Sequence, residues 1–265
     1  MLAISKYLSI CLVLLGFSSC GTQIRALSLL QSEVPRVVVA PEVDPGFPMA
    51  LVSDVQSDIS GPLFSTNGTR LIAVNISGAT IGGFGHVVRW AGGTPAGATA
   101  FTQIAAAYFN DGWNIWDEWW VASVSSAQTN IQAEYHETIV SGGGDGVAMV
   151  VYSIAGTSGV GSSGVNNDQV GTSTLSLTLT AQAEKSLILV GTYLEDCYAL
   201  RPANTDLLPD SIEDENLSEA AVLSAYNYVH YITSAPGTTS VGYLTVNYNG
   251  SSGKKLAAGI ELLAQ

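Results

Sequence analysis

Short apolar runs separated by clusters of Gly, Ser, Asn and Thr dominate the chain after residue 48. Apolar residues hardly ever recur at helical spacing there, whereas strict alternation, which is typical of half-buried strands, is common. Leu175, Leu177 and Leu179 alternate with Thr and Ser, and residues 131–136 alternate in the same way. The pattern predicts strands over 50–55, 70–76, 86–90, 101–108, 116–124, 130–137, 147–154, 172–180, 186–193, 223–232, 240–248 and 256–263.

These strands predict an all-β fold. About ten to twelve short strands with frequent turn signals and no βαβ alternation favour an antiparallel β-sandwich or jelly roll. Residues 50–265 are expected to form this single domain. Its longest loop, 195–219, is acidic, and Glu, Leu and Ala over 211–224 have a spacing that would suit a turn or two of helix.

A glycine-rich run follows the predicted strand 147–154. The sequence Gly159-Val-Gly-Ser-Ser-Gly164 matches the dinucleotide-binding spacing, and Glu184 stands twenty residues further on. That chemistry requires a helix N-terminus at the phosphates, but the residues after Gly164 are turn-like. We therefore predict a flexible loop between strands and no nucleotide site.

The N-terminus has the pattern of an export signal. Lys6 is followed by an apolar stretch over 7–17, which is too short for a comfortable transmembrane helix, and then by Ser18-Ser19-Cys20-Gly21. Residues 1–21 resemble a bacterial lipoprotein leader, in which Cys20 would be lipidated, although Phe17 stands where such leaders usually carry Leu. The sequence therefore predicts an export signal over 1–20 and a cell-surface or extracellular protein, with a lipid anchor as one form.

Residues 21–49 are expected to form a tether or an extended arm. Four prolines within this segment restrict any strand there to a sheet edge or a linker. The apolar stretch 34–43 is a candidate for adding a strand to a neighbouring subunit. The residues assigned to this assembly arm are Val37, Val38 and Val39.

Composition narrows the set of partners. Hydrophobic residues make up 47% of the chain and charged residues 12%, so the core is large and few salt bridges are available. The net charge is -13, and no Lys or Arg lies between Arg89 and Lys185. This balance argues against nucleic acid and against anionic membrane surfaces, so membrane attachment would come only through a lipid anchor. Once the leader is set aside, Cys197 is left alone and has no disulfide partner.

The order of hydrophobic motifs resembles a β-sandwich module that recurs in bacterial surface proteins and phage virion proteins. The resemblance is carried by 70–76, 88–93, 118–121, 146–156 and 186–191, and would cover residues 50–265. The motifs are loose, and the resemblance implies structural or adhesive roles with no shared catalytic residues.

No pattern typical of a metal site or an active site stands out. The acidic loop offers only weak calcium candidates, Asp206, Asp210 and Asp214, without the spacing of a calcium loop, and a solvated charge run is the alternative. The three histidines are far apart in sequence, and no serine elbow is present. Asp111, Asp117 and Glu118 flank tryptophans, as carboxylates in sugar sites often do. We expect neither an enzyme nor a bound cofactor.

Four of the five tryptophans lie within eight residues: Trp113, Trp116, Trp119 and Trp120. Neighbours on a strand point to opposite faces, so Trp119 and Trp120 cannot both be buried on one side of a sheet. One hypothesis places Trp120 and Trp116 in the core, with Trp119 at an edge or under a loop.

The other hypothesis is a contact patch, because aromatic faces stack on sugar rings or anchor protein interfaces. A turn at Gly112 would place Trp113 at a loop tip. The ligand-binding or interface candidates are Trp113, Trp119, Asp111, Asn114 and Asp117.

Together these features favour an exported, non-catalytic surface, filament or virion-type structural or adhesion protein. Its expected partners are further copies of itself or other surface proteins. A carbohydrate-binding module that uses exposed tryptophans is the first alternative, with glycans as ligands. A glycoside hydrolase is the second.

Overall fold

The computed structural model describes residues 38–53, 58–80, 85–110, 114–137, 144–167, 174–195, 197–202, 212–214, 223–232, 236–247 and 253–265. The chain divides into an N-terminal unit, Met1–Val38, and a compact unit, Val39–Gln265, which holds every described strand. Within these ranges all elements are β-strands and none is a helix, so the predicted all-β class is confirmed.

The first half of the unit contains eleven described strands. They are β1 (Glu42–Val43), β2 (Met49–Ser53), β3 (Ile59–Ser60), β4 (Phe64–Thr66), β5 (Arg70–Thr80), β6 (His86–Trp90), β7 (Thr102–Asn110), β8 (Asn114–Val124), β9 (Gln128–Ile131), β10 (Ala133–Glu137) and β11 (Gly144–Ala155). The second half contains eight: β12 (Thr157–Asn166), β13 (Thr174–Ala181), β14 (Leu187–Glu195), β15 (Cys197–Pro202), β16 (Ile212–Asp214), β17 (Leu223–Ile232), β18 (Gly237–Asn247) and β19 (Lys255–Ala264).

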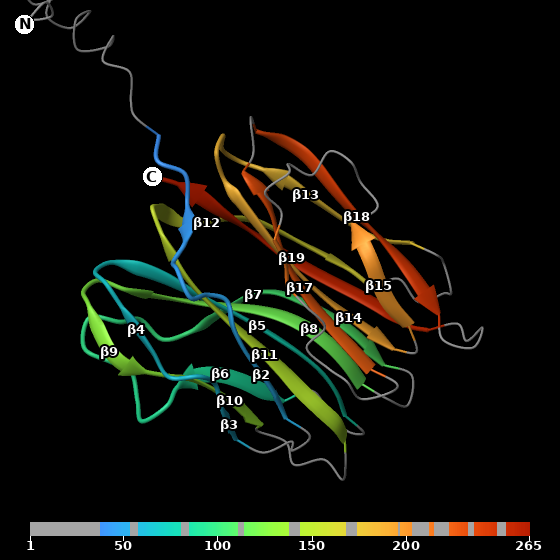
Figure 1. The fold of residues 1–265 in the computed structure, drawn as a ribbon, viewed down its shortest axis with the longest axis horizontal. Coiled ribbons are helices and arrows are strands. Elements are labelled where there is room, and N and C mark those ends of the chain that lie inside the picture. The colour runs from blue at the N-terminus through green and yellow to red at the C-terminus, as the bar shows by residue number, and fades with distance from the viewer. Residues whose placement is uncertain are drawn as a thin grey trace, which may run out of the picture. The chain divides into compact units, whose positions relative to one another are not determined.

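The strands form five antiparallel sheets (Figure 1). Sheet A has the order β1-β11-β5-β8-β7, and β2 also pairs with β11. Sheet B is β3-β10-β6 and sheet C is β4-β9. The second half supplies sheet D, with the order β12-β19-β14-β17-β16, and sheet E, with the order β13-β18-β15.

The two halves repeat one topology. Each half has eight strand positions if β1 with β2, β3 with β4, and β9 with β10 each count as one position. Sheets A and D then share the order 1-8-3-6-5, and sheets B and E share the order 2-7-4. This is a β-sandwich of the jelly-roll type, present twice. Only Gly156 separates β11 of the first sandwich from β12 of the second.

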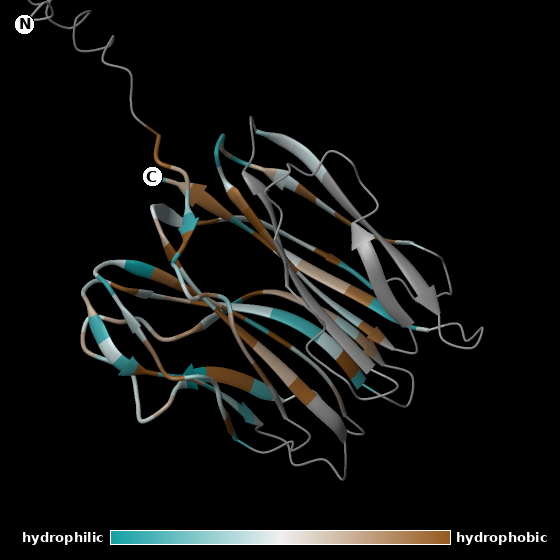
Figure 2. Ribbon diagram, viewed as in Figure 1, coloured by the Kyte–Doolittle hydropathy of each residue, from teal (hydrophilic) through white to brown (hydrophobic). Residues whose placement is uncertain are grey.

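Two hydrophobic cores lie on the two faces of sheet A. Core 1 lies between sheets A and D and includes Trp119, Tyr152 and Ile260. Core 2 lies between sheet A and sheets B and C and includes Trp116, Trp90 and Tyr135. Hydrophobic residues accordingly dominate β19, whereas the short outer strand β9 is mainly hydrophilic (Figure 2). Sheet A is thus an interior layer with two covered faces.

Every strand range predicted from the sequence overlaps a described strand, but the count of about ten to twelve is too low for a described part with nineteen. The additional strands are β1, β3, β4, β12, β15 and β16. Four of them have only two or three residues, which is too short to show a period. A turn or two of helix was predicted over 211–224. Within this range, residues 212–214 form β16 and residues 223–224 begin β17, while the others lie outside the described residues.

The glycine-rich run 159–164 was predicted to be a loop, but it lies within β12. Its glycines permit close contact with neighbouring strands. A Cβ atom at Gly164 would come within 2.6 Å of the Thr178 carbonyl oxygen, and one at Gly161 would collide with the Glu261 carboxylate. Small residues are therefore required for packing here, which explains a strand that lacks an alternating pattern.

Candidate functional site

The tryptophan-rich strand β8 lies inside sheet A, paired with β5 on one side and with β7 on the other. Its side chains alternate between the two cores, as the geometry of a strand requires. Trp116 and Trp120 face core 2, which agrees with their predicted burial, and Trp119 faces core 1. Every residue from 114 to 122 is buried.

This burial contradicts the predicted contact patch for the three of its residues that the structure describes. Trp119 and Asp117 are both 0% exposed, and Asn114 is 5% exposed. The reason is that sheets B, C and D cover both faces of sheet A, so β8 has no solvent face over these residues. Trp113 and Asp111 lie outside the described residues.

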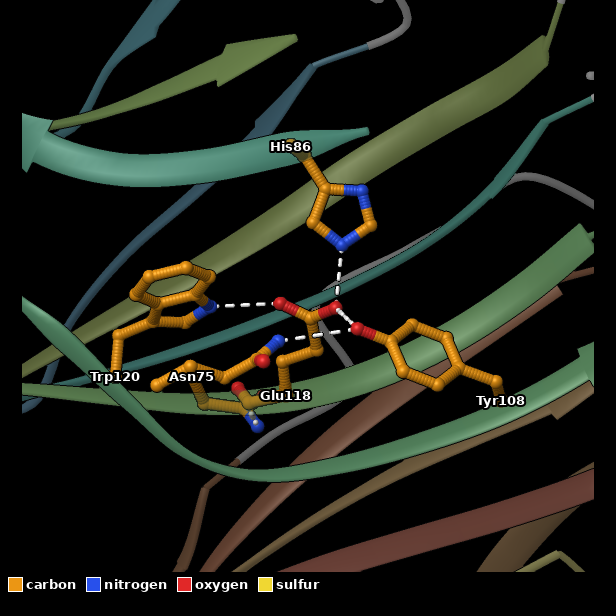
Figure 3. Close-up of polar contacts among 6 residues, drawn as sticks. Asn75, His86, Tyr108, Glu118 and Trp120 are labelled. Atoms are coloured by element: carbon orange, nitrogen blue, oxygen red, sulfur yellow. Dashed lines mark hydrogen bonds and ion pairs between the residues drawn. The ribbon is translucent and has the colours of Figure 1, made fainter. Parts of the chain in front are cut away.

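Glu118 is the centre of a polar cluster in core 2 (Figure 3). Its Oε1 lies 2.5 Å from Nε2 of His86 and also accepts a hydrogen bond from the Tyr108 hydroxyl. Its Oε2 accepts a hydrogen bond from the Trp120 indole N–H at 2.7 Å. Figure 3 shows these groups converging on the carboxyl group from three strands, β6, β7 and β8. Both carboxyl oxygens are therefore engaged within the protein.

Aromatic rings surround the same cluster. The His86 ring stacks on Trp116, with centroids 4.9 Å apart and planes inclined by 29°, and lies 5.8 Å from the Tyr135 ring. Burial and the neighbouring Glu118 raise the pKa of Tyr108, so its hydroxyl stays protonated and donates. The cluster can hold protons in fixed positions, but its hydrogen bonds are directed inward to the carboxyl group.

Asp117 is the centre of a second polar cluster, on the opposite face of β8. Its Oδ1 accepts hydrogen bonds from Asn75 Nδ2 at 2.7 Å and from the Ser77 hydroxyl at 3.2 Å. Its Oδ2 accepts from the backbone N–H of Ala258 at 2.9 Å. The pKa of Asp117 is raised to about 7, mainly by burial; the nearby charge of Glu118 adds to this rise, and the hydrogen bonds oppose it.

Asp117 and Trp119 together connect the two sandwiches. While Asp117 accepts from the Ala258 N–H, the Trp119 indole N–H donates to the Ala258 carbonyl oxygen at 2.9 Å. Ala258 belongs to β19 of sheet D, so two side chains of β8 bind the backbone N–H and C=O of a single residue of the other sandwich. Gly191 in β14 provides the space, because a Cβ there would lie 2.7 Å from Asp117 Oδ1 and would collide with Asn75.

A third buried carboxylate, Glu261, is also structural. It accepts hydrogen bonds from the backbone N–H groups of Ser162, Gln182 and Ala183. Burial acts to raise the pKa of Glu261, but the hydrogen bonds from Ser162, Ser186, Gln182 and Ala183 outweigh it and lower the pKa. The carboxylate thereby holds β12 and the turn after β13 against β19.

The remaining candidates are placed as follows. Cys20 and Val37 of the predicted lipidation site and arm lie outside the described residues, as do Asp206 and Asp210. Asp214 lies in β16, and the described residues contain no group of three side chains suited to a metal ion. Val38 begins the described chain, and Val39 pairs with Gln265 of the same chain through two backbone hydrogen bonds of 2.9 Å.

Sequence reasoning missed the partners of Asp117 and Glu118. His86 and Tyr108 lie 32 and 10 residues from Glu118, and Ala258 lies 141 residues from Asp117. Asn75 and Ser77 interrupt the apolar pattern of β5, which pairs with β8, and these two polar residues could have indicated a buried polar cluster.

Comparison of the chain with protein-family models, with curated proteins and with solved structures finds no match. Among the described residues, no helix has the length and apolar character needed to cross a membrane.

Proposed function

We propose that this chain is an exported, non-catalytic structural protein, a component of a cell surface, filament or virion that assembles with copies of itself or with other surface proteins. The observation that carries the proposal is the use of the β8 polar and aromatic groups. Asp117, Glu118 and Trp119 are buried and bonded to neighbouring strands, and two of them bind the second sandwich. Side chains of a kind that often bind ligands or take part in catalysis are therefore used here to hold the strands and the two sandwiches together.

Three features of the sequence support the same proposal independently of the structure. The export pattern over 1–20 predicts a location outside the cytoplasm, where a β-sandwich protein with few charged residues is a suitable building block. The resemblance to sandwich modules of surface and virion proteins implies a structural role. The high negative charge argues against nucleic-acid binding.

The two alternatives receive less support from the geometry. A carbohydrate-binding module requires exposed aromatic faces, but Trp116, Trp119 and Trp120 are buried. A glycoside hydrolase requires two carboxyl groups on either side of one bond, whereas those of Asp117 and Glu118 lie on opposite faces of sheet A.

The test is to produce the full chain in a bacterial host and to follow both its location and its assembly. We expect fractionation and protease treatment of intact cells to place the protein at the surface or in the medium. We expect electron microscopy of the purified protein to show ordered oligomers or filaments. A protein that stays in the cytoplasm, or that remains monomeric at high concentration, would contradict the proposal.

A further inference from the structure

Residues 38–53, the first described segment, are bonded mainly along one edge of β11. Glu42 and Val43 of β1 pair with Ala155 and Ile154, and β2 pairs with Val147–Val151, both in β11. Val39 pairs with Gln265 after the end of β19, so the first described residues lie beside the C-terminus (Figure 1). The segment therefore closes the outer edge of sheet A, since β11 pairs with β5 on its other side.

A polar contact fixes the register of this segment. Asp44 Oδ2 lies 2.6 Å from Nε of Arg70 and accepts a hydrogen bond from the Ser153 hydroxyl at 2.6 Å. The Asp44 N–H donates to the Ser153 carbonyl oxygen at 2.8 Å. A slip by one residue would break all three contacts, so the register is specific.

Apolar side chains of the same segment complete both cores. Val43 packs against core 1, and Phe47, Met49 and Leu51 pack against core 2. The Phe47 ring meets the Phe64 ring edge to face, with centroids 5.7 Å apart. Without the segment, the edge of β11 and these apolar surfaces would be open to another strand.

The segment is also suited to exchange. It lies at the start of the compact unit, its strands are short, and Pro41, Pro45 and Pro48 have no N–H groups to donate to a sheet. Any second copy carries the same side chains, so it can make the same contacts in trans, and exchange of identical elements is a low-cost route to oligomers. We infer that residues 38–53 of one copy pair with β11 of a second copy, and that this exchange joins subunits in the assembly. The inference rests on the proposed structural function.

Disulfide trapping tests the exchange. The full chain, with Cys11, Cys20 and Cys197 each replaced by Ser, would carry Glu42→Cys and Ala155→Cys, which face each other across β1 and β11. Monomer and oligomer fractions are separated by size, oxidised, and run on non-reducing gels. We expect disulfides within one chain in the monomer, and disulfides between chains, giving a ladder, in the oligomer.

A control pair, Arg89→Cys with Glu134→Cys, lies opposite across β6 and β10 and should give only disulfides within one chain in every fraction. If the first pair does not oxidise, Val39→Cys with Gln265→Cys replaces it. Oligomers that contain only disulfides within one chain would overturn the exchange and leave the proposed function standing. Absence of oligomers at every concentration would overturn the proposed function as well.

Discussion

Asp117 and Glu118 are adjacent in β8, yet their carboxyl groups lie in different cores. Glu118 accepts from Trp120 and Tyr108 in core 2, whereas Asp117 accepts from Asn75 and from a backbone N–H of sheet D. Both residues are 0% exposed, so each carboxyl group depends on its own hydrogen bonds for stability. One dipeptide therefore connects three layers of the structure, and its two halves can be tested separately.

Replacement of the Glu118 carboxyl group should destabilise the first sandwich. In Glu118→Gln an amide N–H₂ takes the place of an oxygen that accepts from surrounding donors, which leaves a buried group unpaired. We expect a loss of about 2 to 4 kcal/mol in the free energy of unfolding, measured by urea denaturation. The control, Glu134→Gln, lies on the outer face of sheet B beside Arg89 and should change stability by less than about 1 kcal/mol. Equal effects from the two variants would show that Glu118 is not a structural centre.

Asp117 should make stability depend on pH. Burial raises its pKa from 3.8 in the unfolded chain to about 7. Between these values the folded protein keeps a proton that the unfolded chain has lost, so this contribution is fully present below pH 3.8 and is lost as the pH rises through 7. We expect the free energy of unfolding to fall by up to about 1.4 kcal/mol per pH unit between pH 5 and 7.

The variant Asp117→Asn should lack this slope, because the amide does not titrate. Urea denaturation of both proteins across pH 5 to 7 provides the measurement. Glu261 changes the free energy of unfolding in the opposite direction and at lower pH. Because its pKa is lowered by folding, its stabilising contribution is present above its ordinary pKa and is lost as the pH falls through the lowered value. An identical slope in the two proteins would exclude Asp117 as its source.

The sequence predicts the strands well because alternation is a local property. Leu175, Leu177 and Leu179 were expected on one face of a strand and are all buried on one face of β13. β12 was missed because its glycines do not alternate with larger apolar residues; Gly161 and Gly164 instead leave room for Glu261 of β19 and Thr178 of β13. The strand pattern predicted one β-sandwich or jelly roll over residues 50–265, but it did not reveal that the same strand order is present twice.

The candidate site was predicted only in part. The alternation rule showed that Trp119 and Trp120 must point to opposite faces, and they do. It could not show that a second sandwich covers the face of Trp119, because that depends on the packing of β8 against β19, more than a hundred residues away in the sequence. A residue that looks exposed from one sheet alone is therefore buried by the next layer.

Gly191 should resist substitution because of the Asp117 cluster. An added Cβ would lie 2.7 Å from Asp117 Oδ1 and would collide with Asn75 Nδ2. Overpacking of this kind costs about 1 to 3 kcal/mol, so we expect Gly191→Ala to lower the free energy of unfolding by that amount. In the Asn75→Ala background the amide is gone and the same substitution should cost less. Additive losses in the double variant would contradict the proposed contact.

Trp119 should contribute both packing and a hydrogen bond between the sandwiches. Trp119→Phe keeps an aromatic ring in core 1 but removes the indole N–H that donates to the Ala258 carbonyl oxygen. We expect a loss of about 1 to 3 kcal/mol in the free energy of unfolding, since the Ala258 carbonyl oxygen loses a buried hydrogen bond and a small cavity opens. Hydrogen exchange shows where the structure loosens. Faster exchange of amides in β19 than in β10 would indicate that the contact with sheet D has weakened. Uniform acceleration in both strands would instead mean that Trp119 supports the whole fold and has no particular role in joining the sandwiches.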